Sequence, residues 1–104
     1  TCFGIGAGDA LSVLDATIAA RAHDGPGAGA GYTHRLLTDR NLRLKKLGEE
    51  ASELVTACAD GDAVRATEET ADLLYHALVA LRAVGGSLDG VRDVLDARAS
   101  ARAR

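Results

Sequence analysis

The segment KKLGEEASELVTACADGDAVRATEETADLLYH, residues 45–76, decides the fold, because it holds two helical patterns joined by a tight turn. Before the turn, apolar residues recur every three or four positions, which is typical of an amphipathic helix. After the turn, apolar residues occupy almost the whole circumference of the second helix, as in a helix at the centre of a bundle. Asp60-Gly61-Asp62 forms the turn and caps the second helix. So short a connection predicts antiparallel neighbours.

The helix before the turn is expected at residues 42–59, and the helix after it at residues 63–84. At about 100° per residue, the apolar side chains of the first helix fall within a stripe about 100° wide. They are Leu44, Leu47, Ala51, Leu54, Val55 and Cys58. Cys58 is therefore expected to be a small buried hydrophobic residue. The apolar side of the second helix consists of Leu74, Leu78 and Leu81.

Two shorter helices are expected on the N-terminal side of this pair. Apolar spacing predicts one over residues 9–22, with Asp9 as its N-cap. The other is expected over residues 32–41, with Thr33 as a candidate cap and a turn at Arg40-Asn41.

A last helix is expected on the C-terminal side. Gly85-Gly86 ends the long second helix, and Ser87 caps a helix that reaches about Leu95. Residues 99–104 alternate arginine with small residues and are expected to fray. Residues 9–98 then form one domain.

The composition supports a helical fold. A chain of 104 residues forms one domain with a modest core, which oligomerisation helps to complete. Alanine and leucine dominate, there is a single proline, and aromatic residues make up 3% of the chain. These features favour helices over a sandwich or barrel, and they predict an all-α bundle of four or five helices.

Several partner classes are excluded by charge and hydropathy. The net charge of −3 is too small and too mixed to indicate a nucleic-acid or membrane surface. The chain shows no signal peptide and no apolar run of membrane length. Cys2 and Cys58 are far apart in the sequence and lie in different contexts, so we expect no disulfide between them. Two free thiols indicate a reducing compartment. The chain is therefore expected to be cytoplasmic.

The two long helices carry acidic clusters. Glu50 and Glu53 are neighbours on the first helix, as residues three apart are. On the second helix, Glu69, Asp72 and His76 share a stripe about 60° wide. A carboxylate buried without a partner costs several kcal/mol, and a hard divalent cation held by oxygens neutralises it. The pattern predicts a Mg²⁺-dependent phosphate enzyme, with Mn²⁺ as a substitute ion.

The basic residues beside the first acidic cluster fit the same chemistry. Lys45 and Lys46 precede the acids and can hold phosphate oxygens as point charges. A bound Mg²⁺ can polarise a phosphoanhydride and activate a water molecule. The expected reaction is therefore hydrolysis of the phosphate chain of a nucleotide.

A structural explanation of the same residues stays open. Acidic pairs three apart are common on exposed helix faces, so the chain could also be a non-catalytic helical dimerisation module. His76 is a packing histidine in most proteins; here it could instead orient a carboxylate or touch a phosphate. Redox iron is disfavoured, because a di-iron bundle needs a Glu-x-x-His repeat on two helices.

Three stretches of the sequence form motifs that together are specific for one protein family. They are Tyr32-Thr33-His34-Arg35-Leu36-Leu37, Lys45-Lys46-Leu47-Gly48-Glu49-Glu50-Ala51-Ser52-Glu53 and Glu68-Glu69-Thr70-Ala71-Asp72-Leu73-Leu74-Tyr75-His76. With the closing Gly86-Ser87-Leu88-Asp89-Gly90-Val91, they resemble the phosphoribosyl-ATP pyrophosphohydrolase family, which performs the second step of histidine biosynthesis. The resemblance covers residues 11–98.

The resemblance implies an all-α fold of the MazG-like nucleoside triphosphate pyrophosphatase type, assembled as a homodimer or higher oligomer. It also implies Mg²⁺-dependent hydrolysis of phosphoribosyl-ATP to phosphoribosyl-AMP and pyrophosphate. A related alternative is a housekeeping pyrophosphatase of the same superfamily that acts on ordinary nucleoside triphosphates.

The resemblance assigns roles position by position. The residues that match the catalytic, metal-binding acids of the family are Glu50, Glu53, Glu69 and Asp72, with Glu49 as a neighbouring candidate. Lys46 and His76 match the lysine before Gly-Glu-Glu and the histidine of the Tyr-His pair. Lys45 and Arg35 are further candidates for binding substrate phosphates.

The N-terminus resembles a second enzyme. Thr1-Cys2-Phe3 is similar to the closing motif of phosphoribosyl-AMP cyclohydrolase, which is fused ahead of this domain in many bacteria. Residues 1–8 are therefore expected to be a leader or a junction with such a domain, which implies a functional link to the cyclohydrolase. No zinc site is expected, because the other ligands are missing.

Overall fold

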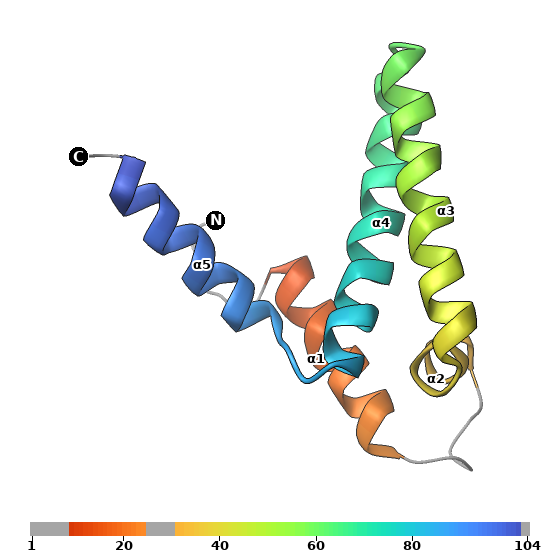
Figure 1. Cartoon of the computed structure of the whole chain (residues 1–104), viewed down its shortest axis with the longest axis vertical. Coiled ribbons are helices and arrows are strands. Elements are labelled where there is room, and N and C mark those ends of the chain that lie inside the picture. Colours follow the sequence, from red (N-terminus) through yellow and green to blue (C-terminus); the bar gives the residue numbers. More distant parts are fainter. Residues whose placement is uncertain (1–8, 25–30, 103–104) are drawn as a thin grey trace.

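The structure, a computed structural model, describes residues 9–24 and 31–102. Those residues form helices and no strand, which confirms the all-α class (Figure 1). The helices are α1 (Ala10–Asp24), α2 (Tyr32–Thr38), α3 (Arg40–Ala59), α4 (Ala63–Ala83) and α5 (Leu88–Arg102). None of them is both long and apolar enough to span a membrane.

The α3–α4 hairpin is the largest unit of the fold. Its turn works as expected: Gly61 adopts a φ of 70°, and the Asp62 carboxylate accepts a hydrogen bond from the Arg65 amide at 3.0 Å. At the other end of α3, Asp39 accepts a bond from the Leu42 amide. These caps satisfy amides that have no partner inside a helix. The hairpin sets α3 and α4 side by side and antiparallel (Figure 1).

The hydrophobic core surrounds the second half of α4. Its buried members are Ile18, Leu36, Leu78, Val79 and Leu88, contributed by α1, α2, α4 and α5. Helix α4 packs against α1, α2 and α3, which confirms its central place. A side-chain ion pair between Asp15 and Arg82, at 3.2 Å, also joins α1 to α4.

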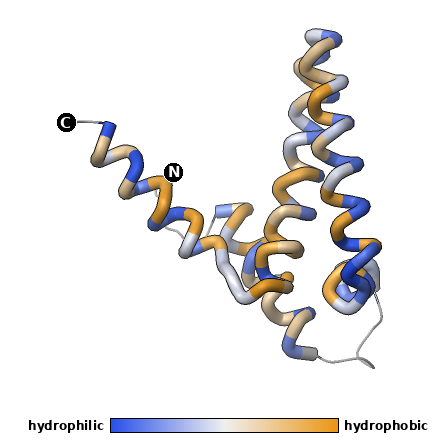
Figure 2. The backbone as a smooth tube through the Cα atoms, viewed as in Figure 1, coloured by the Kyte–Doolittle hydropathy of each residue, from blue (hydrophilic) through white to orange (hydrophobic). Residues whose placement is uncertain are grey.

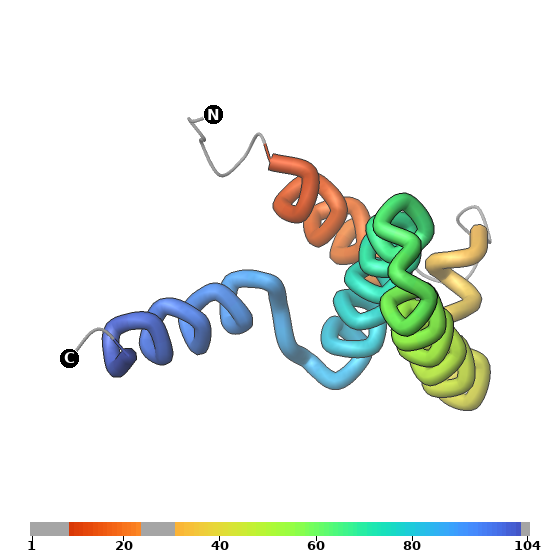
Figure 3. The backbone as a smooth tube through the Cα atoms, turned by 90° about the horizontal axis from the view of Figure 1, so that it is seen from above, coloured from red at the N-terminus to blue at the C-terminus, as the bar shows by residue number. Residues whose placement is uncertain are grey.

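Helix α5 leaves the other four helices. Gly85 adopts a φ of 91°, and the Gly86 amide donates to the Leu81 carbonyl at 2.9 Å, so the two glycines end α4 as expected. The chain then turns, and α5 extends away from the hairpin (Figures 1 and 3). Arg92 fastens α5 to the start of α1 through Asp9, at 3.1 Å.

Some expected boundaries were wrong. Arg40 and Asn41 form the first turn of α3 rather than a separate turn, because Asp39 provides the cap. Thr33 does not cap α2; its hydroxyl instead bonds the Tyr75 hydroxyl. Helix α5 continues to Arg102, so most of the segment expected to fray is helical. Residues 1–8, including Cys2 and the expected junction, lie outside the described residues.

The apolar stripe expected on α3 was also partly wrong. Cys58 is exposed, and Val55 keeps 67% of its surface exposed. The residues of α3 that are buried are Glu50 and Ala57. Helix α3 is therefore rotated so that an acidic residue and small side chains face α4, while part of its apolar stripe faces outward.

Candidate metal centre

Three carboxylates converge between α3 and α4. Glu50 comes from α3, and Glu69 and Asp72 come from α4 one turn apart. One oxygen from each lies within 4.8 Å of the others. The antiparallel pairing expected from the short turn therefore brings Glu50 to two acids that follow it by 19 and 22 residues in the sequence.

The three acids differ in exposure. Glu50 is buried, with 9% of its surface exposed, Glu69 is half-buried, and Asp72 is exposed. The buried carboxylate of the cluster is therefore Glu50 on α3 and not Asp72 on α4. The reason is the rotation of α3, which turns Glu50 toward α4. The cluster has an inner side at Glu50 and an outer side open to solvent at Asp72.

The donor set suits a hard divalent cation. All three ligands are carboxylate oxygens, which Mg²⁺ prefers. In an octahedral shell of about 2.1 Å radius, ligand oxygens lie about 3 to 4 Å apart. Side-chain rotation could draw the three oxygens to that spacing, since they already lie within 4.8 Å of one another. The residues therefore fit a Mg²⁺ ion.

The negative charges of the cluster lie close together and raise the pKa values of its carboxyl groups. Burial raises the pKa of Glu50, and the charge of Glu53 raises it further, whereas His76 lowers it. The pKa of Glu69 is raised by burial and by the charges of Glu53 and Asp72. A cation among these groups would relieve the repulsion that holds both pKa values up.

Glu53 and Glu49 lie beside the cluster in different ways. Glu53 is exposed and outside the group of three, but its charge raises the pKa of both Glu50 and Glu69. Glu49 pairs with Lys46 instead, with 3.2 Å between Nζ and Oε1. The four acids Glu50, Glu53, Glu69 and Asp72 thus form one electrostatic unit, and Glu49 belongs to the neighbouring ion pair.

The three basic residues predicted to bind substrate phosphates are Lys46, Arg35 and Lys45, and of these Lys46 interacts with the acids directly. Lys46 is half-buried, and the hydrogen bond that it donates to Glu49 raises its pKa; the charges of Tyr32 and Glu50 also raise the pKa of Lys46. Arg35 is exposed on α2, with its guanidinium carbon 5.5 Å from the centre of the Tyr32 ring. Lys45 is exposed on α3. The side chain of Lys46 therefore places a positive charge beside the acids.

His76 lies at the inner side, 7% exposed. Its Nδ1 lies 2.9 Å from the carbonyl oxygen of Asp72, and its Nε2 lies 3.0 Å from the Tyr32 hydroxyl. Both ring nitrogens therefore have partners within the chain. The sequence did not predict this contact, because 44 positions separate the two residues.

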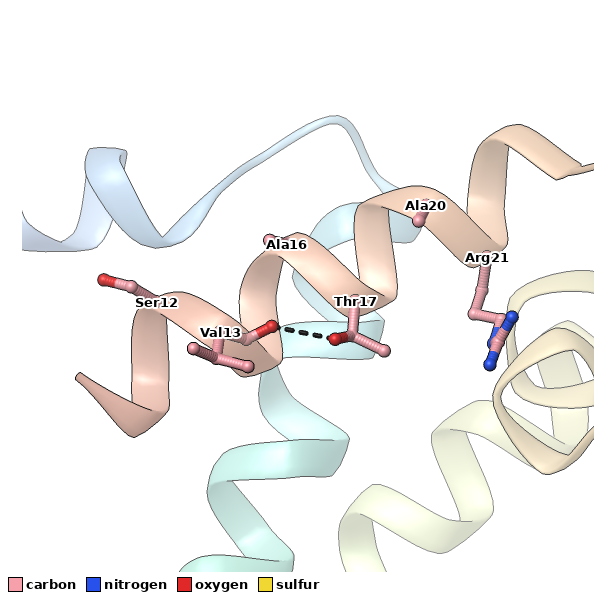
Figure 4. A pocket seen from close by; sticks show the side chains of 6 residues that line it. All are labelled: Ser12, Val13, Ala16, Thr17, Ala20 and Arg21. Carbon is pink, nitrogen blue, oxygen red and sulfur yellow. Dashed lines mark hydrogen bonds between the residues drawn. The ribbon is translucent and has the colours of Figure 1, made fainter. Parts of the chain in front are cut away.

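A hollow in the surface lies elsewhere, on α1. A depression of 540 Å³ follows the outer face of α1 and is lined by Ser12, Val13, Ala16, Thr17, Ala20 and Arg21 (Figure 4). Its lining contains no carboxylate, and the Thr17 hydroxyl is engaged by the Val13 carbonyl at 2.9 Å. The acid cluster is therefore the better candidate for chemistry.

Comparison with known proteins agrees with this geometry. The family model described as phosphoribosyl-ATP pyrophosphohydrolase matches residues 11–99, which include all five helices except the ends of α1 and α5. The chain belongs to the phosphoribosyl-ATP pyrophosphohydrolase family. As a member of this family, it is a hydrolase with a role in histidine biosynthesis.

Individual relatives support the family assignment. The phosphoribosyl-ATP pyrophosphatase of Caulobacter vibrioides NA1000 is 47% identical over 90 residues, covering 86% of this chain and 82% of the relative. The corresponding protein of Streptococcus sanguinis is 51% identical over 61 residues, 59% of each chain. The histidine biosynthesis bifunctional protein HisIE of Parasynechococcus marenigrum is 43% identical over 94 residues, covering 89% of this chain and 41% of the relative.

Proposed function

We propose that the carboxylates of Glu50, Glu69 and Asp72 hold Mg²⁺ for the hydrolysis of phosphoribosyl-ATP to phosphoribosyl-AMP and pyrophosphate. The observation that carries this proposal is the convergence of three carboxylate oxygens within 4.8 Å, on two helices of a chain from this family. Mn²⁺, which also accepts oxygen ligands, is the expected substitute.

The proposed role of each acidic residue follows from how exposed its side chain is. When bound, Mg²⁺ supplies positive charge that stabilises phosphate oxygens. Glu50 closes the inner side of the site, while Asp72 lies at the solvent side, where the triphosphate of the substrate enters. Glu53, one turn after Glu50, completes the acidic set and can orient or deprotonate the attacking water.

The cations beside the site bind the substrate. Lys46 lies close enough to Glu50 for the two charges to interact, so its ammonium group can reach phosphate oxygens at the edge of the cluster. Arg35 offers a planar donor group suited to a terminal phosphate. Lys45 adds positive charge at the exposed surface.

A second copy of the chain completes the fold. Helices α1, α4 and α5 enclose an apolar groove of 350 Å³, lined by Leu11, Leu74, Ala77, Leu78, Leu81, Leu88, Val91, Arg92 and Leu95. Apolar and polar residues alternate along α5 (Figure 2), although this helix stands apart from the other helices. A helix of 15 residues is marginal without packing. A homodimer in which this face is covered would bury it.

The cellular setting follows from the reaction. The product of the proposed reaction, phosphoribosyl-AMP, is the substrate of the cyclohydrolase that the N-terminal motif resembles. One relative, the protein of Parasynechococcus marenigrum, is named as bifunctional. We place this chain in the cytoplasm, in functional association with that cyclohydrolase.

Turnover measurements test the proposal. The protein should release pyrophosphate from phosphoribosyl-ATP in the presence of Mg²⁺, and EDTA should abolish the reaction. Asp72→Asn should remove most of the activity, whereas Asp93→Asn, an exposed position on α5, should not. Hydrolysis of ordinary dNTPs but not of phosphoribosyl-ATP would identify a housekeeping pyrophosphatase. No Mg²⁺ binding by calorimetry and no turnover would identify a helical dimerisation module.

A further inference from the structure

The first two residues of α2 are bonded to two consecutive residues of α4. The Tyr32 hydroxyl meets His76 Nε2 at 3.0 Å, and the Thr33 hydroxyl meets the Tyr75 hydroxyl. The rings of Tyr75 and His76 also touch edge to face, with centroids 4.9 Å apart. A compact polar and aromatic contact therefore joins α2 to the helix that carries Glu69 and Asp72.

The hydrogen bonds of His76 fix its tautomer. The Asp72 carbonyl oxygen can only accept a hydrogen bond, so Nδ1 must carry the proton that it donates. In the neutral ring, Nε2 is then an acceptor, and the Tyr32 hydroxyl donates to it. The imidazole thus links the backbone of one metal-binding residue to a side chain of α2.

Helix α2 depends on such contacts. It has seven residues, too few to be stable by itself, and its N-cap Gly31 makes no side-chain cap bond. Arg43 holds its other end by donating to the carbonyl oxygens of Leu36 and Leu37. The start of α2 is held by Tyr32 and Thr33 alone among the hydrogen bonds of the described side chains.

The position of α2 is important because this helix carries Tyr32 and Arg35. The Arg35 guanidinium lies over the Tyr32 ring, 5.5 Å from its centroid, and Lys46 is close enough to Tyr32 for each to affect the pKa of the other. Tyr75 stacks with the same tyrosine at 6.3 Å. Since Tyr32 already contacts Arg35, Tyr75 and His76, its ring is better placed to orient these groups than to stack on a nucleobase.

We propose that His76 is a positioning residue, which holds Tyr32 and through it Arg35 at the edge of the acid cluster, and that it does not contact the substrate. The proposal rests on the proposed function, because Arg35 is a substrate-phosphate ligand in it. It revises the role of His76 from phosphate contact to orientation of the residues that make such contacts.

Two substitutions separate the two bonds of the ring. An asparagine amide ends near the place of Nδ1, so His76→Asn can still donate to the Asp72 carbonyl but loses the bond to Tyr32. A glutamine amide reaches toward the place of Nε2, so His76→Gln can accept from the Tyr32 hydroxyl. Tyr32→Phe removes that hydroxyl and keeps the ring under Arg35. His23→Asn, at an exposed position on α1, is the matched control.

We expect His76→Asn to lower kcat/KM about tenfold or more, mainly by raising KM, since displaced binding groups misalign the substrate. His76→Gln should recover most of the loss, and His23→Asn should show none. The Mg²⁺ concentration for half-maximal activity should stay unchanged in these variants. In the Tyr32→Phe background, the difference between Asn and Gln at position 76 should disappear, because both act through the same hydroxyl.

Three results would overturn the proposal. If the Asn–Gln difference persisted without the tyrosine hydroxyl, His76 would act on the substrate directly. If all variants unfolded at lower temperature but kept normal kcat/KM below it, the contact would be merely structural. If ¹⁵N NMR of the wild-type imidazole found the proton on Nε2 rather than Nδ1, the bonding scheme would be wrong. The NMR experiment needs no turnover, so it tests the hydrogen bond between His76 and Tyr32 even if phosphoribosyl-ATP proves not to be the substrate.

Discussion

Glu50 is the residue at which the conflict between folding and function is sharpest. It is an acid at a buried position, and burial together with Glu53 raises its pKa. A buried acid destabilises a fold, so under the proposed function Glu50 serves the cation rather than the stability of the chain. Substitution should therefore affect activity and stability in opposite directions.

For Glu50→Gln, we expect turnover to fall by a factor on the order of 10² or more, or the Mg²⁺ requirement to rise, because the charge toward the cation is lost. The metal-free protein should be as stable as the wild type or more stable, since like-charge repulsion is relieved. Steady-state kinetics across Mg²⁺ concentrations and thermal unfolding in EDTA measure the two effects. Glu68→Gln, an exposed neighbour of Glu69, is the control. A much lower melting temperature with normal turnover would contradict both parts.

The raised pKa values also predict how stability depends on pH. The pKa values of Glu50 and Glu69 lie above their ordinary value of 4.5, so between that value and the raised ones the folded protein binds more protons than the unfolded chain. The free energy of unfolding then falls as pH rises through this window and is larger below it. In EDTA, the melting temperature should rise as pH is lowered through the raised pKa values toward the ordinary value of 4.5. Glu50→Gln should reduce that rise; an identical rise in both proteins would assign it to other groups.

At the scale of the helix, Gly48 is an unusual residue for the interior of α3. A glycine there lowers helix stability by about 0.5 to 1 kcal/mol relative to alanine. A Cβ atom built at this position meets nothing within 4 Å in the chain. Gly48→Ala should therefore raise the melting temperature, as measured by circular dichroism.

Gly86 provides the matched comparison for Gly48. A Cβ atom there would overlap Leu81 Cδ1 and lie 2.7 Å from Leu81 Cγ, so Gly86→Ala should lower the melting temperature. Equal responses of the two alanine variants would show that the local packing described here does not govern them.

The helices also show what could be predicted from sequence. Local signals worked: Asp62, Gly61 and Ser87 cap or turn the chain where their chemistry indicates. Spacing plus a short turn also sufficed to bring Glu50 near Glu69 and Asp72. The rotation of α3 was missed, because its outward apolar residues and its inward Glu50 depend on tertiary contacts that periodicity does not contain. The Tyr32–His76 bond was missed for the same reason.

At the scale of the whole molecule, the departure of α5 leaves apolar surface uncovered. Leu74 on α4 is 43% exposed and Leu95 on α5 is 54% exposed, and both line the groove shared with α1. The apolar spacing of α5 predicts that Leu88, Val91 and Leu95 face inward, but only Leu88 is buried, and Val91 and Leu95 are exposed. The spacing could not reveal that, beyond Leu88, this face lines an open groove rather than the core of its own chain.

Leu95→Asp tests the proposed homodimer. The charge would face the apolar groove, and burying it without a partner would cost several kcal/mol, so the dimer should dissociate at micromolar concentration. Val64→Asp is the control, because Val64 is 74% exposed at the tip of the hairpin, away from the groove. Sedimentation velocity should give a dimer for the wild type and for the control, and a monomer for Leu95→Asp. Because the acid cluster is built from α3 and α4 of one chain, the monomer should still bind Mg²⁺ if it stays folded. A dimer that survives this substitution would mean that the second copy binds elsewhere, and the outward apolar residues of α3 would then be the surface to test.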